Sequence, residues 1–504
     1  MSDRVDVAII GGGLAGLSLA LQLTRRMPEL EVTVIDRSRR PARERTSTVG
    51  ESFAELGSHY LRDVIGLADH LDADELPKFG LRFFVGDAWD FDDRFELGVL
   101  DPVISEVKDD RLIGLPLRTH QVDRARLENE MAVRAVHAGV RLLEETSVEE
   151  VDLDPEGHRL LLRGATSGRL DAAWVVSASG AIPGQDVERR SLGHRLRAGW
   201  FRVEGDLDVG AWSSRPSYFE HTPPGFRRLS TNHLMGQGYW IWLIPLPSGV
   251  TSVGIVSDPD VVDPRPATHA ELRSWIEARD PRLGHELASA RPVDAQPHVT
   301  ETEAFVTRSF HPNRSATVGG AAAFVDVLYS PGADLIALGN TLLTELIERD
   351  RAGGRLPGAC AIANRVFEGF VEGLAEIYRG QYRNFGAPEV IATKAVWDSA
   401  LYFGFNTLLF RHGLSGDARF LARIQPELLT LKTLQARVQG RFRRGDPVPL
   451  LPTGDATVEW GHIDWLMSAY YGAAEQTDEA GVIHHLRSML TSLEQVGRRI
   501  EGVA

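Results

Sequence analysis

The glycine turn at residues 11–16, Gly-Gly-Gly-Leu-Ala-Gly, constrains the fold of this chain more than any other feature. An almost unbroken apolar run at residues 5–10 precedes it, as expected of a buried parallel strand, and the apolar segment at residues 17–23 predicts a helix after it. A glycine pattern of this kind is a weak signal alone, but between a strand and a helix it indicates a dinucleotide-binding βαβ unit. An ordinary glycine-rich turn without a ligand is the less favoured interpretation.

Each glycine of the turn has a predicted role. Gly11 permits the tight turn, Gly13 lets the backbone approach a pyrophosphate, and Gly16 lets the helix pack against the strand. Ala15 lies at the start of the helix, whose free N–H groups favour phosphate charge. We therefore expect Gly11, Gly13, Ala15 and Gly16 to contact the cofactor.

An acidic residue and a group of arginines follow the second predicted strand, at residues 31–35. Asp36 stands at roughly the 20-residue spacing from the glycines that is expected of the acid that binds a ribose hydroxyl. Arg37 comes next, and further arginines follow up to Arg45. We predict cofactor contacts from Asp36 and Arg37. The arginine-rich segment as a whole is either a solvated loop or a contact to the phosphate or adenine of the cofactor.

Composition limits the remaining possibilities. The chain has 504 residues, enough for two or three domains, and its 70 acidic and 55 basic residues give a net charge of -15, which argues against a nucleic-acid partner. Cys360 is the single cysteine, so an intramolecular disulfide or a cysteine-based metal cluster is excluded, and we expect no metal. The N-terminal apolar stretch carries Asp6 and the glycine turn in place of a cleavage site, and no apolar run has membrane-spanning length. We expect a cytoplasmic protein without a membrane partner.

The pattern of the sequence changes near residue 355. Before this point it is typical of an α/β protein, and residues from about 186 to 304 are rich in aromatics, prolines and alternating strands. From residue 357 on, apolar residues recur at helical spacing. The predicted fold class is α/β: a Rossmann-type nucleotide-binding domain at residues 1–355, with an inserted β-sheet substrate layer, and a mainly helical C-terminal domain at residues 356–504.

Three further segments resemble characteristic stretches of the flavoprotein monooxygenase superfamily. They are Gln-Val-Asp-Arg-Ala-Arg-Leu at residues 121–127, the stretch ending in Ala-Ser-Gly at residues 173–180, and Thr-Val-Gly-Gly-Ala-Ala at residues 317–322. The resemblance implies a fold that binds FAD in an extended form, with a contact from Arg124. Gly320 departs from the superfamily pattern, because an aspartate usually stands there and approaches the ribityl chain.

Residues 1–355 also resemble the flavin-dependent halogenases of the tryptophan halogenase-like branch. Trp-Ile-Trp-Leu-Ile-Pro at residues 240–245 matches the WxWxIP signature of that family and is the most specific motif. Val-Gly-Glu-Ser at residues 49–52 resembles the VGES segment beside the flavin. Lys-Phe-Gly at residues 78–80 resembles the K-x-G segment that carries the catalytic lysine of the family.

The resemblance implies a chemistry in which reduced FAD and dioxygen give a flavin hydroperoxide, and a bound chloride or bromide attacks it to give hypohalous acid. Lys78 would hold or activate the oxidised halogen, as a hydrogen-bond donor or as a chloramine, since burial of a lysine lowers its pKa. Trp240 and Trp242 would keep the substrate away from the flavin, unless they are core aromatics at alternate positions of a strand. Glu51 would contact the flavin.

The same resemblance implies partners and a pocket. The substrate would be a small electron-rich aromatic molecule, free or tethered to a carrier protein, and a separate flavin reductase would supply the reduced FAD, because no second nucleotide fingerprint is evident. Apart from the resemblance, we expect the helical region to form a lid over the substrate cavity, with an oligomerisation or partner surface as the alternative. Its aromatic residues would line an apolar substrate pocket unless they are core residues. These aromatics are Tyr378, Tyr382, Trp397, Tyr402 and Phe403.

The segment from Asp326 to Asp334 departs from the halogenase pattern. In the family, a D-P-x-x-S-x-G-type segment lies over the flavin and binds the halide through backbone N–H groups. Asp326 is expected to contact the cofactor, but Pro331 has no N–H to donate, so Gly332 and Ala333 remain as halide donors. Asp334 adds a negative charge that disfavours an anion.

Halogenation is therefore the favoured function, with two alternatives of different kinds. One is a flavoprotein monooxygenase, or another FAD-dependent oxidoreductase, that uses the halogenase scaffold without halide chemistry. The other is a flavin-binding scaffold that is not a working enzyme.

Overall fold

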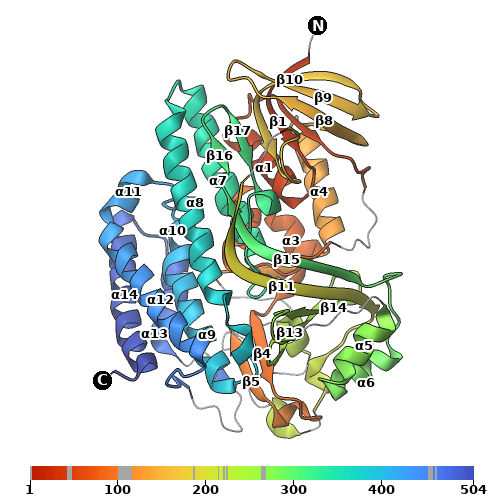
Figure 1. The fold of residues 1–504 in the computed structure, drawn as a ribbon, viewed down its shortest axis with the longest axis vertical. Coiled ribbons are helices and arrows are strands. Elements are labelled where there is room, and N and C mark those ends of the chain that lie inside the picture. The colour runs from red at the N-terminus through yellow and green to blue at the C-terminus, as the bar shows by residue number, and fades with distance from the viewer. Residues whose placement is uncertain are drawn as a thin grey trace.

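The structure is a computed structural model that describes residues 3–41, 48–99, 116–184, 188–213, 215–219, 222, 225–262, 268–451, 458–459 and 463–503. A mainly parallel sheet carries the glycine turn (Figure 1). Its described strands follow the order β16-β17-β10-β1-β2-β7, and β9 and β8 extend it beside β10. The strands are β1 (Asp3–Ile10), β2 (Val32–Ile35), β7 (Arg141–Leu143), β8 (Thr146–Asp152), β9 (His158–Gly164), β10 (Gly168–Ser177), β16 (Phe310–His311) and β17 (Ser315–Thr317).

The first βαβ unit has the predicted form. β1 pairs in parallel with β2 and β10, and the buried helix α1 (Leu14–Arg26) connects β1 to β2. The helix predicted from the segment at residues 121–127 is α4 (Arg124–His137), and Asp123 caps it by accepting the Ala125 N–H. The expected α/β fold is confirmed.

A second, mostly antiparallel sheet lies below the first in the view of Figure 1. Its described strands follow the order β18-β15-β11-β14-β13-β12-β4-β5-β19. They are β4 (Leu81–Val85), β5 (Phe95–Val99), β11 (Arg189–Glu204), β12 (Thr231–Gly236), β13 (Tyr239–Pro245), β14 (Val250–Ser257), β15 (His298–Thr307), β18 (Ala323–Phe324) and β19 (Val458–Glu459). The sheet therefore extends beyond the predicted insertion, because the β4–β5 hairpin comes from earlier in the chain. A small sheet pairs β3 (Leu76–Lys78) with β6 (Thr119–Gln121).

Helices dominate the remainder of the chain. The α-helices outside the first unit are α2 (Glu55–His59), α3 (Ala68–Asp74), α5 (His269–Glu277), α6 (Pro281–Ser289), α7 (Gly332–Arg351), α8 (Leu356–Tyr378), α9 (Pro388–Leu401), α10 (Leu408–Arg411), α11 (Ala418–Arg423), α12 (Gln425–Arg444), α13 (Asp464–Ala474) and α14 (Glu479–Glu501). Two π-helical segments are η1 (Tyr60–Val64) and η9 (Tyr402–Thr407). The short 3-10 turns are η2 (Phe91–Asp93), η4 (Val209–Ala211), η5 (Pro216–Phe219), η6 (Arg227–Leu229), η7 (Gly319–Ala321) and η8 (Tyr382–Asn384).

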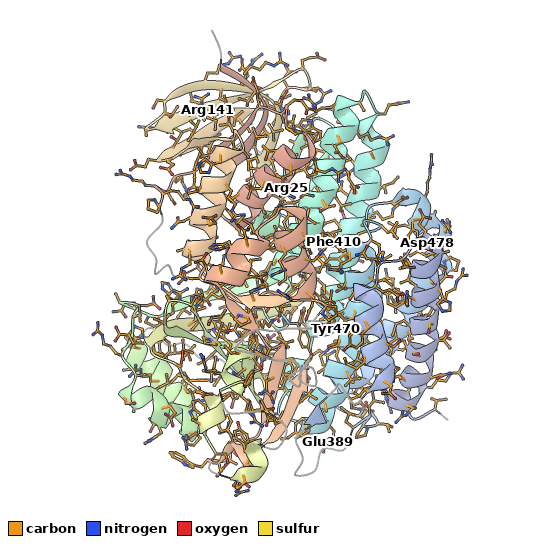
Figure 2. The ribbon with its side chains drawn as sticks, turned by 180° about the vertical axis from the view of Figure 1, so that it is seen from behind. Arg25, Arg141, Glu389, Phe410, Tyr470 and Asp478 are labelled. Carbon is orange, nitrogen blue, oxygen red and sulfur yellow. The ribbon has the colours of Figure 1, made fainter. Side chains whose placement is uncertain are left out.

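The C-terminal helices share one hydrophobic core with the nucleotide-binding part, and this core runs from the first strand to Ile500. The ring of Phe410 meets that of Tyr60 edge-on, and the hydroxyl of Tyr470 donates to the carbonyl of Leu117 at 3.3 Å (Figure 2). Among the described residues, no helix is long and apolar enough to cross a membrane.

Candidate active site

The glycine turn has the backbone geometry that the predicted tight turn and close helix–strand packing require. A Cβ added to Gly16 would lie 1.9 Å from the carbonyl oxygen of Gly11, so only glycine allows α1 to approach β1 this closely. A Cβ on Gly13, by contrast, would meet no atom within 4 Å. Gly11 has a φ of +111°, which an L side chain rarely adopts. The turn thus combines a tight helix–strand contact with open space at Gly13, as a bound pyrophosphate requires.

Asp36 and one arginine close the turn from the side of β2. The Asp36 Oδ2 accepts the Gly12 N–H at 2.8 Å. The Arg40 guanidinium donates to the carbonyl of Gly12 and lies 3.8 Å from Asp36. Arg37 is exposed. The structure therefore brings Arg40, rather than Arg37, to the glycine turn, a difference that the sequence spacing alone does not reveal.

A second arginine lies on the other side of this region. Arg124 donates to the carbonyl of Val49 at 2.6 Å and to Glu128 at 2.5 Å. Glu128 also lies 3.8 Å from Arg40, so one carboxylate joins the two guanidinium groups. In the part of the chain that the structure describes, the buried Nε atoms of Arg40 and Arg124 have no hydrogen-bond partner. Two cations with unused donors beside the glycine turn fit the charge of a dinucleotide.

The segment at residues 317–322 lies on the far side of α1. Gly319 has a φ of +63°, and a Cβ there would lie 2.6 Å from the Cβ of Ala15. Gly320 is exposed, and a Cβ there would meet nothing within 4 Å. Both this segment and the glycine turn thus leave open backbone around the start of α1. These residues fit an extended FAD, with the polar contact of the usual aspartate missing at Gly320.

Glu51 has its carboxylate occupied within the protein. Arg202, on β11, donates to the Glu51 carboxylate at 2.6 and 3.0 Å. Burial raises the pKa of Glu51, and the Arg202 guanidinium opposes that shift. The pair ties the segment at residues 49–52 to the second sheet, so the structure gives Glu51 a positioning contact.

Asp326 is likewise bonded on every side. Its carboxylate accepts the N–H groups of Val327 and Leu328 at 2.7 and 2.9 Å, lies 2.6 Å from His194, and accepts the Tyr382 hydroxyl at 2.9 and 3.0 Å. These bonds fold the loop that leads into α7.

Pro331 caps the N-terminus of α7, directly after two residues in left-handed conformations, Tyr329 and Ser330, with φ values of 66° and 61°. The first α7 amide that donates to a carbonyl of the preceding turn is that of Leu335, to Pro331 at 3.0 Å. The amides before it are free of helical bonds, as at any helix start. Gly332 is exposed with nothing within 4 Å of an added Cβ.

Ala333, the second predicted halide donor, is in a tighter position. It is buried, and a Cβ added to Gly57 of α2 would lie 2.6 Å from its side chain. Gly332 is therefore the more accessible of the two backbone donors for a halide.

Lys78 lies at the end of β3, where pairing with β6 fixes the backbone. Its side chain is 3% exposed, and its Nζ donates to the carbonyl of Phe53 at 2.9 Å. Burial lowers the pKa of Lys78 to about 8, against the opposing effect of the carboxyl groups of Glu55 and Asp334. The ammonium and amine forms are therefore both present near neutral pH.

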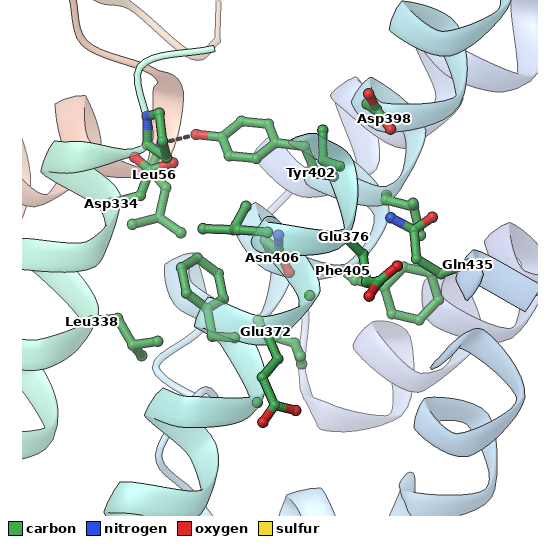
Figure 3. A pocket seen from close by; sticks show the side chains of 18 of the residues that line it. Leu56, Asp334, Leu338, Glu372, Glu376, Asp398, Tyr402, Phe405, Asn406 and Gln435 are labelled. Carbon is green, nitrogen blue, oxygen red and sulfur yellow. Dashed lines mark hydrogen bonds between the residues drawn. The ribbon is translucent and has the colours of Figure 1, made fainter. Parts of the chain in front are cut away.

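Two buried carboxyl groups accompany this lysine. The Asp334 Oδ1 accepts the Gly57 N–H at 2.8 Å, and burial raises the pKa of Asp334 to about 7. Burial also raises the pKa of Glu55, and Lys78 opposes this shift. The Tyr402 hydroxyl hydrogen-bonds to Asp334 and accepts the Leu56 N–H at 2.8 Å (Figure 3).

Sequence reasoning missed Glu55 as a site residue. It lies on a five-residue helix, and no local pattern connects it with Lys78 or with the start of α7. The fold alone brings these groups together.

These groups form one end of a cavity of about 1190 Å³ between the sheets and the C-terminal helices. Lys78, Glu55, Asp334 and Pro331 line this end, which we call the reactive end, and residues of α8, α9, η9, α11 and α12 line other parts. Figure 3 shows Asp334 of this end with Tyr402 and Asn406 of η9. The five aromatics singled out in the helical region divide into two groups. Tyr378, Tyr402 and Phe403 line the cavity.

The other two aromatics are core residues with internal partners. The indole N–H of Trp397 donates to Gln435 at 2.6 Å, and the Tyr382 hydroxyl donates to Asp326. Both side chains are fully buried.

Trp240 and Trp242 share one face of β13, as their alternate positions predict, with ring centroids 5.9 Å apart. Trp240 donates to the Tyr382 hydroxyl at 2.9 Å, and Trp242 donates to Ser252 at 3.1 Å. Neither is among the described residues that line the cavity.

A chain of aromatic contacts links Trp240 to the cavity wall. It runs through His233 at 5.2 Å, then Phe83 at 4.6 Å, and reaches Tyr329 at 6.0 Å between centroids. Tyr329 lines the cavity. Trp240 is thus separated from the cavity by His233, Phe83 and Tyr329, which favours the interpretation of core aromatics.

The glycine turn, the open backbone around α1 and the two sheets belong to a mixed α/β fold that the chain shares with solved flavin-dependent halogenases. Residues 115–355 match the family model described as tryptophan halogenase, and residues 6–209 match that described as lycopene cyclase protein. The chain is therefore similar to the flavin-dependent halogenases, the family that its motifs predicted.

Individual relatives agree with this assignment. The chain is 26% identical over 386 residues to the flavin-dependent halogenase chlA of Dictyostelium discoideum, covering 69% of this chain and 60% of that protein. It is 23% identical over 351 residues to a Pseudomonas fluorescens chlorinase of 1H-pyrrole-2-carbonyl peptidyl-carrier protein, covering 66% of this chain and 74% of that one. The solved halogenase PltM, in complex with phloroglucinol and FAD, shares the fold with a TM-score of 0.64 at 16% identity, covering 98% of this chain and 96% of that one.

Proposed function

We propose that this chain is a flavin-dependent halogenase that transfers chlorine or bromine to an electron-rich carbon of an organic substrate. The observation that carries the proposal is the position of Lys78. It is a buried lysine whose pKa is lowered by burial to about 8, and it lines a cavity of about 1190 Å³ together with Pro331 and Asp334 at the N-terminus of α7. A solvated surface lysine has none of these properties.

FAD would be held by residues of the first βαβ unit and by two arginines. Gly11, Gly13, Ala15 and Gly16 form the phosphate turn, and Asp36 is the ribose acid. Arg40 and Arg124 supply positive charge at either side. Reduced FAD, when bound, supplies with dioxygen the oxidising power that converts a halide into an electrophilic halogen.

The chain itself would bind the halide and direct the halogen. The Gly332 N–H is the accessible donor for a chloride or bromide, with Ala333 in a supporting position. The carbonyl of Phe53 orients Lys78 Nζ, which donates a hydrogen bond to the oxidised halogen as an ammonium or forms an N–halogen bond as an amine. Lys78 then presents the halogen to the substrate.

The site contains groups that can accept the proton released by the reaction. Halogenation of an aromatic carbon forms a carbon–halogen bond and releases the ring proton. Glu55 and Asp334 are the buried carboxyl groups beside Lys78, and burial raises both pKa values. Either carboxylate accepts that proton without water entering the cavity.

The substrate is proposed to be an aromatic molecule such as a phenol, indole or pyrrole, because the electrophilic halogen requires an electron-rich carbon. Among relatives, PltM is described with phloroglucinol, and the Pseudomonas protein acts on a pyrrole attached to a carrier protein. A separate reductase is proposed to supply the reduced FAD.

One observation favours a second candidate, a flavoprotein monooxygenase without halide chemistry. Pro331 removes a backbone donor from the halide loop, and Asp334 adds a carboxylate within the first turn of α7. In that case the substrate carbon gains oxygen directly.

A single-turnover reaction distinguishes these functions. Purified protein is mixed with chemically reduced FAD, oxygen, bromide or chloride, and a panel of phenols, indoles and pyrroles, and products are identified by mass spectrometry. A product with the isotope pattern of the added halogen supports halogenation. A product heavier by one oxygen atom and free of halogen identifies a monooxygenase. A protein that binds FAD but does not accelerate its reaction with oxygen is a scaffold.

A further inference from the structure

The cavity extends well beyond the space around Lys78. From the reactive end it continues as a groove between α8 and the pair α11–α12. We define the groove by its lining residues Val366, Gly369 and Gly373 on α8 and Leu421, Leu428 and Leu431 on α11 and α12. These six residues are apolar or lack a side chain, and the charged residues Arg365, Glu372 and Lys432 border them. The cavity therefore has one end with buried ionisable groups and one long arm with an apolar strip that charged side chains border.

The length of the apolar arm follows from α8. Among its lining residues, Ile362, Val366, Gly369, Gly373 and Ile377 recur every three or four positions and so lie along one face of the helix. Arg365, Phe370, Glu372, Leu374 and Glu376 line the cavity beside that face. At the helical rise per residue, this face is about 22 Å long. Tyr378, directly after Ile377, donates to the carbonyl of Leu328 at 2.9 Å, so this end of α8 adjoins the reactive end. A single aromatic ring at Lys78 leaves most of the arm empty.

Two glycines in the middle of α8 keep the groove wide. A Cβ on Gly369 or on Gly373 would meet no atom within 4 Å, so no neighbouring element requires glycine at either position. Glycine inside a helix is less favourable than alanine. The groove is therefore wider over the turn of α8 between Gly369 and Gly373. A larger side chain at either position would stabilise the helix but narrow the groove.

We propose that this groove binds an apolar tail of the substrate, so that the preferred substrate is an electron-rich ring carrying an extended alkyl or acyl chain. The ring lies at Lys78 and the chain lies along α8. This inference rests on the proposed function, because the halogenation site defines which end of the substrate is polar. Apolar surface of the arm, continuous with the reactive end, provides the binding energy for the chain.

The test measures binding of a homologous series to FAD-loaded protein by calorimetry. The probes are 5-alkylresorcinols of increasing chain length, from methyl upward. For the unaltered protein we expect the affinity to rise with each methylene, by up to about fourfold per group. Gly373→Leu fills the groove, and we expect it to bind the shortest probe as the unaltered protein does and to lose the gain with chain length.

Gly358→Leu is the matched control. Gly358 lies on the same helix, a Cβ there also meets nothing within 4 Å, and it is outside the described residues that line the cavity. The control should keep the gain with chain length. An affinity independent of chain length, or a gain that persists in Gly373→Leu, overturns the inference.

The binding test does not depend on turnover, so the two proposals fail separately. If the affinity rises with chain length and Gly373→Leu abolishes the rise, but no probe is halogenated, the tail site is supported and the proposed function is not. If short phenols are halogenated and chain length has no effect on affinity, only the tail site is overturned.

Discussion

At the scale of single residues, burial gives Lys78, Glu55 and Asp334 their chemical character. Each is removed from water, so the charged form of each is costly, and the pKa values of the lysine and the carboxyl groups move toward one another. The pKa of Lys78, about 8, and that of Asp334, about 7, therefore lie close together, so a proton exchanged between these two groups changes the free energy little. Exposed lysine and carboxyl side chains, by contrast, have pKa values far from neutral pH and remain charged there.

Asp334 should make the stability of the protein depend on pH. Its pKa is raised by burial from 3.8 to about 7, so its contribution to stability is full below about pH 3.8 and is lost as the pH rises to about 7. Asp334→Asn keeps an acceptor for the Gly57 N–H and removes the titration. Between about pH 5.5 and 8 we expect the free energy of unfolding of the variant to gain about 2 kcal/mol relative to the unaltered protein. Urea unfolding at both pH values measures this, and an equal difference at the two values contradicts it.

Pro331 should limit halide affinity, because it replaces a backbone donor at the start of α7. Pro331→Ser restores an N–H group at that position. A hydrogen bond to an anion is worth about 1.5 kcal/mol or more, so we expect the KM for chloride or bromide to fall by about tenfold.

Pro388→Ser is the matched control for this substitution, because Pro388 stands at the start of α9. It should leave the halide dependence unchanged. An unchanged halide KM in Pro331→Ser would show that the halide does not bind at this loop.

At the scale of elements, the glycines of the first βαβ unit have two different roles. Gly16 lets α1 pack against β1, and Gly13 leaves space for the cofactor. Gly16→Ala would bring a Cβ against the carbonyl of Gly11, which forces α1 away from β1. We expect it to lower the free energy of unfolding of the FAD-free protein by about 1–3 kcal/mol, as overpacking does. Gly13→Ala fits the backbone, with a φ of −83°, and meets no neighbouring atom.

Gly13→Ala should therefore leave the free energy of unfolding of the FAD-free protein unchanged. It should lower the affinity for FAD about tenfold, which corresponds to about 1.4 kcal/mol of binding free energy. Thermal unfolding and flavin fluorescence titration measure the two quantities. If Gly13→Ala binds FAD as tightly as the unaltered protein, the turn does not contact the cofactor.

The elements that the sequence predicted are those with a local signal. The strand, turn and helix at residues 5–23 follow from neighbouring residues, and the alternate tryptophans of β13 follow from strand geometry. Glu55 and Arg40 have no such signal, because a short helix and a loop bring them to the site only through tertiary packing. For the same reason the sequence does not separate Arg37 from Arg40, since arginines a few positions apart in a loop are equivalent in sequence. Arg37 is exposed, and its contact to the cofactor stays a prediction.

At the scale of the whole molecule, the helical region is part of the same core as the nucleotide-binding fold. Buried residues from α1 to α14 belong to one cluster, and β19 pairs with β5. The predicted boundary at residue 355 lies between the helices α7 and α8, which both contribute to that core. We expect one cooperative thermal transition for the whole chain, seen by calorimetry.

A chain truncated after residue 355 should expose the core and fail to bind FAD. Two separate transitions in the whole chain, or a truncated chain that folds and binds FAD, would show that the two parts are independent domains.

The proposed halogenation depends on Lys78 at the reactive end of the cavity. The most direct measurement is the amount of brominated product in a single turnover with bromide for the unaltered protein, Lys78→Ala, and the control Lys432→Ala at the exposed rim of the cavity. A trap for hypobromous acid is included. We expect Lys78→Ala to bind FAD and release trappable hypobromous acid without brominated product, and Lys432→Ala to brominate normally. Full bromination by a Lys78→Ala protein that binds FAD normally would contradict the account.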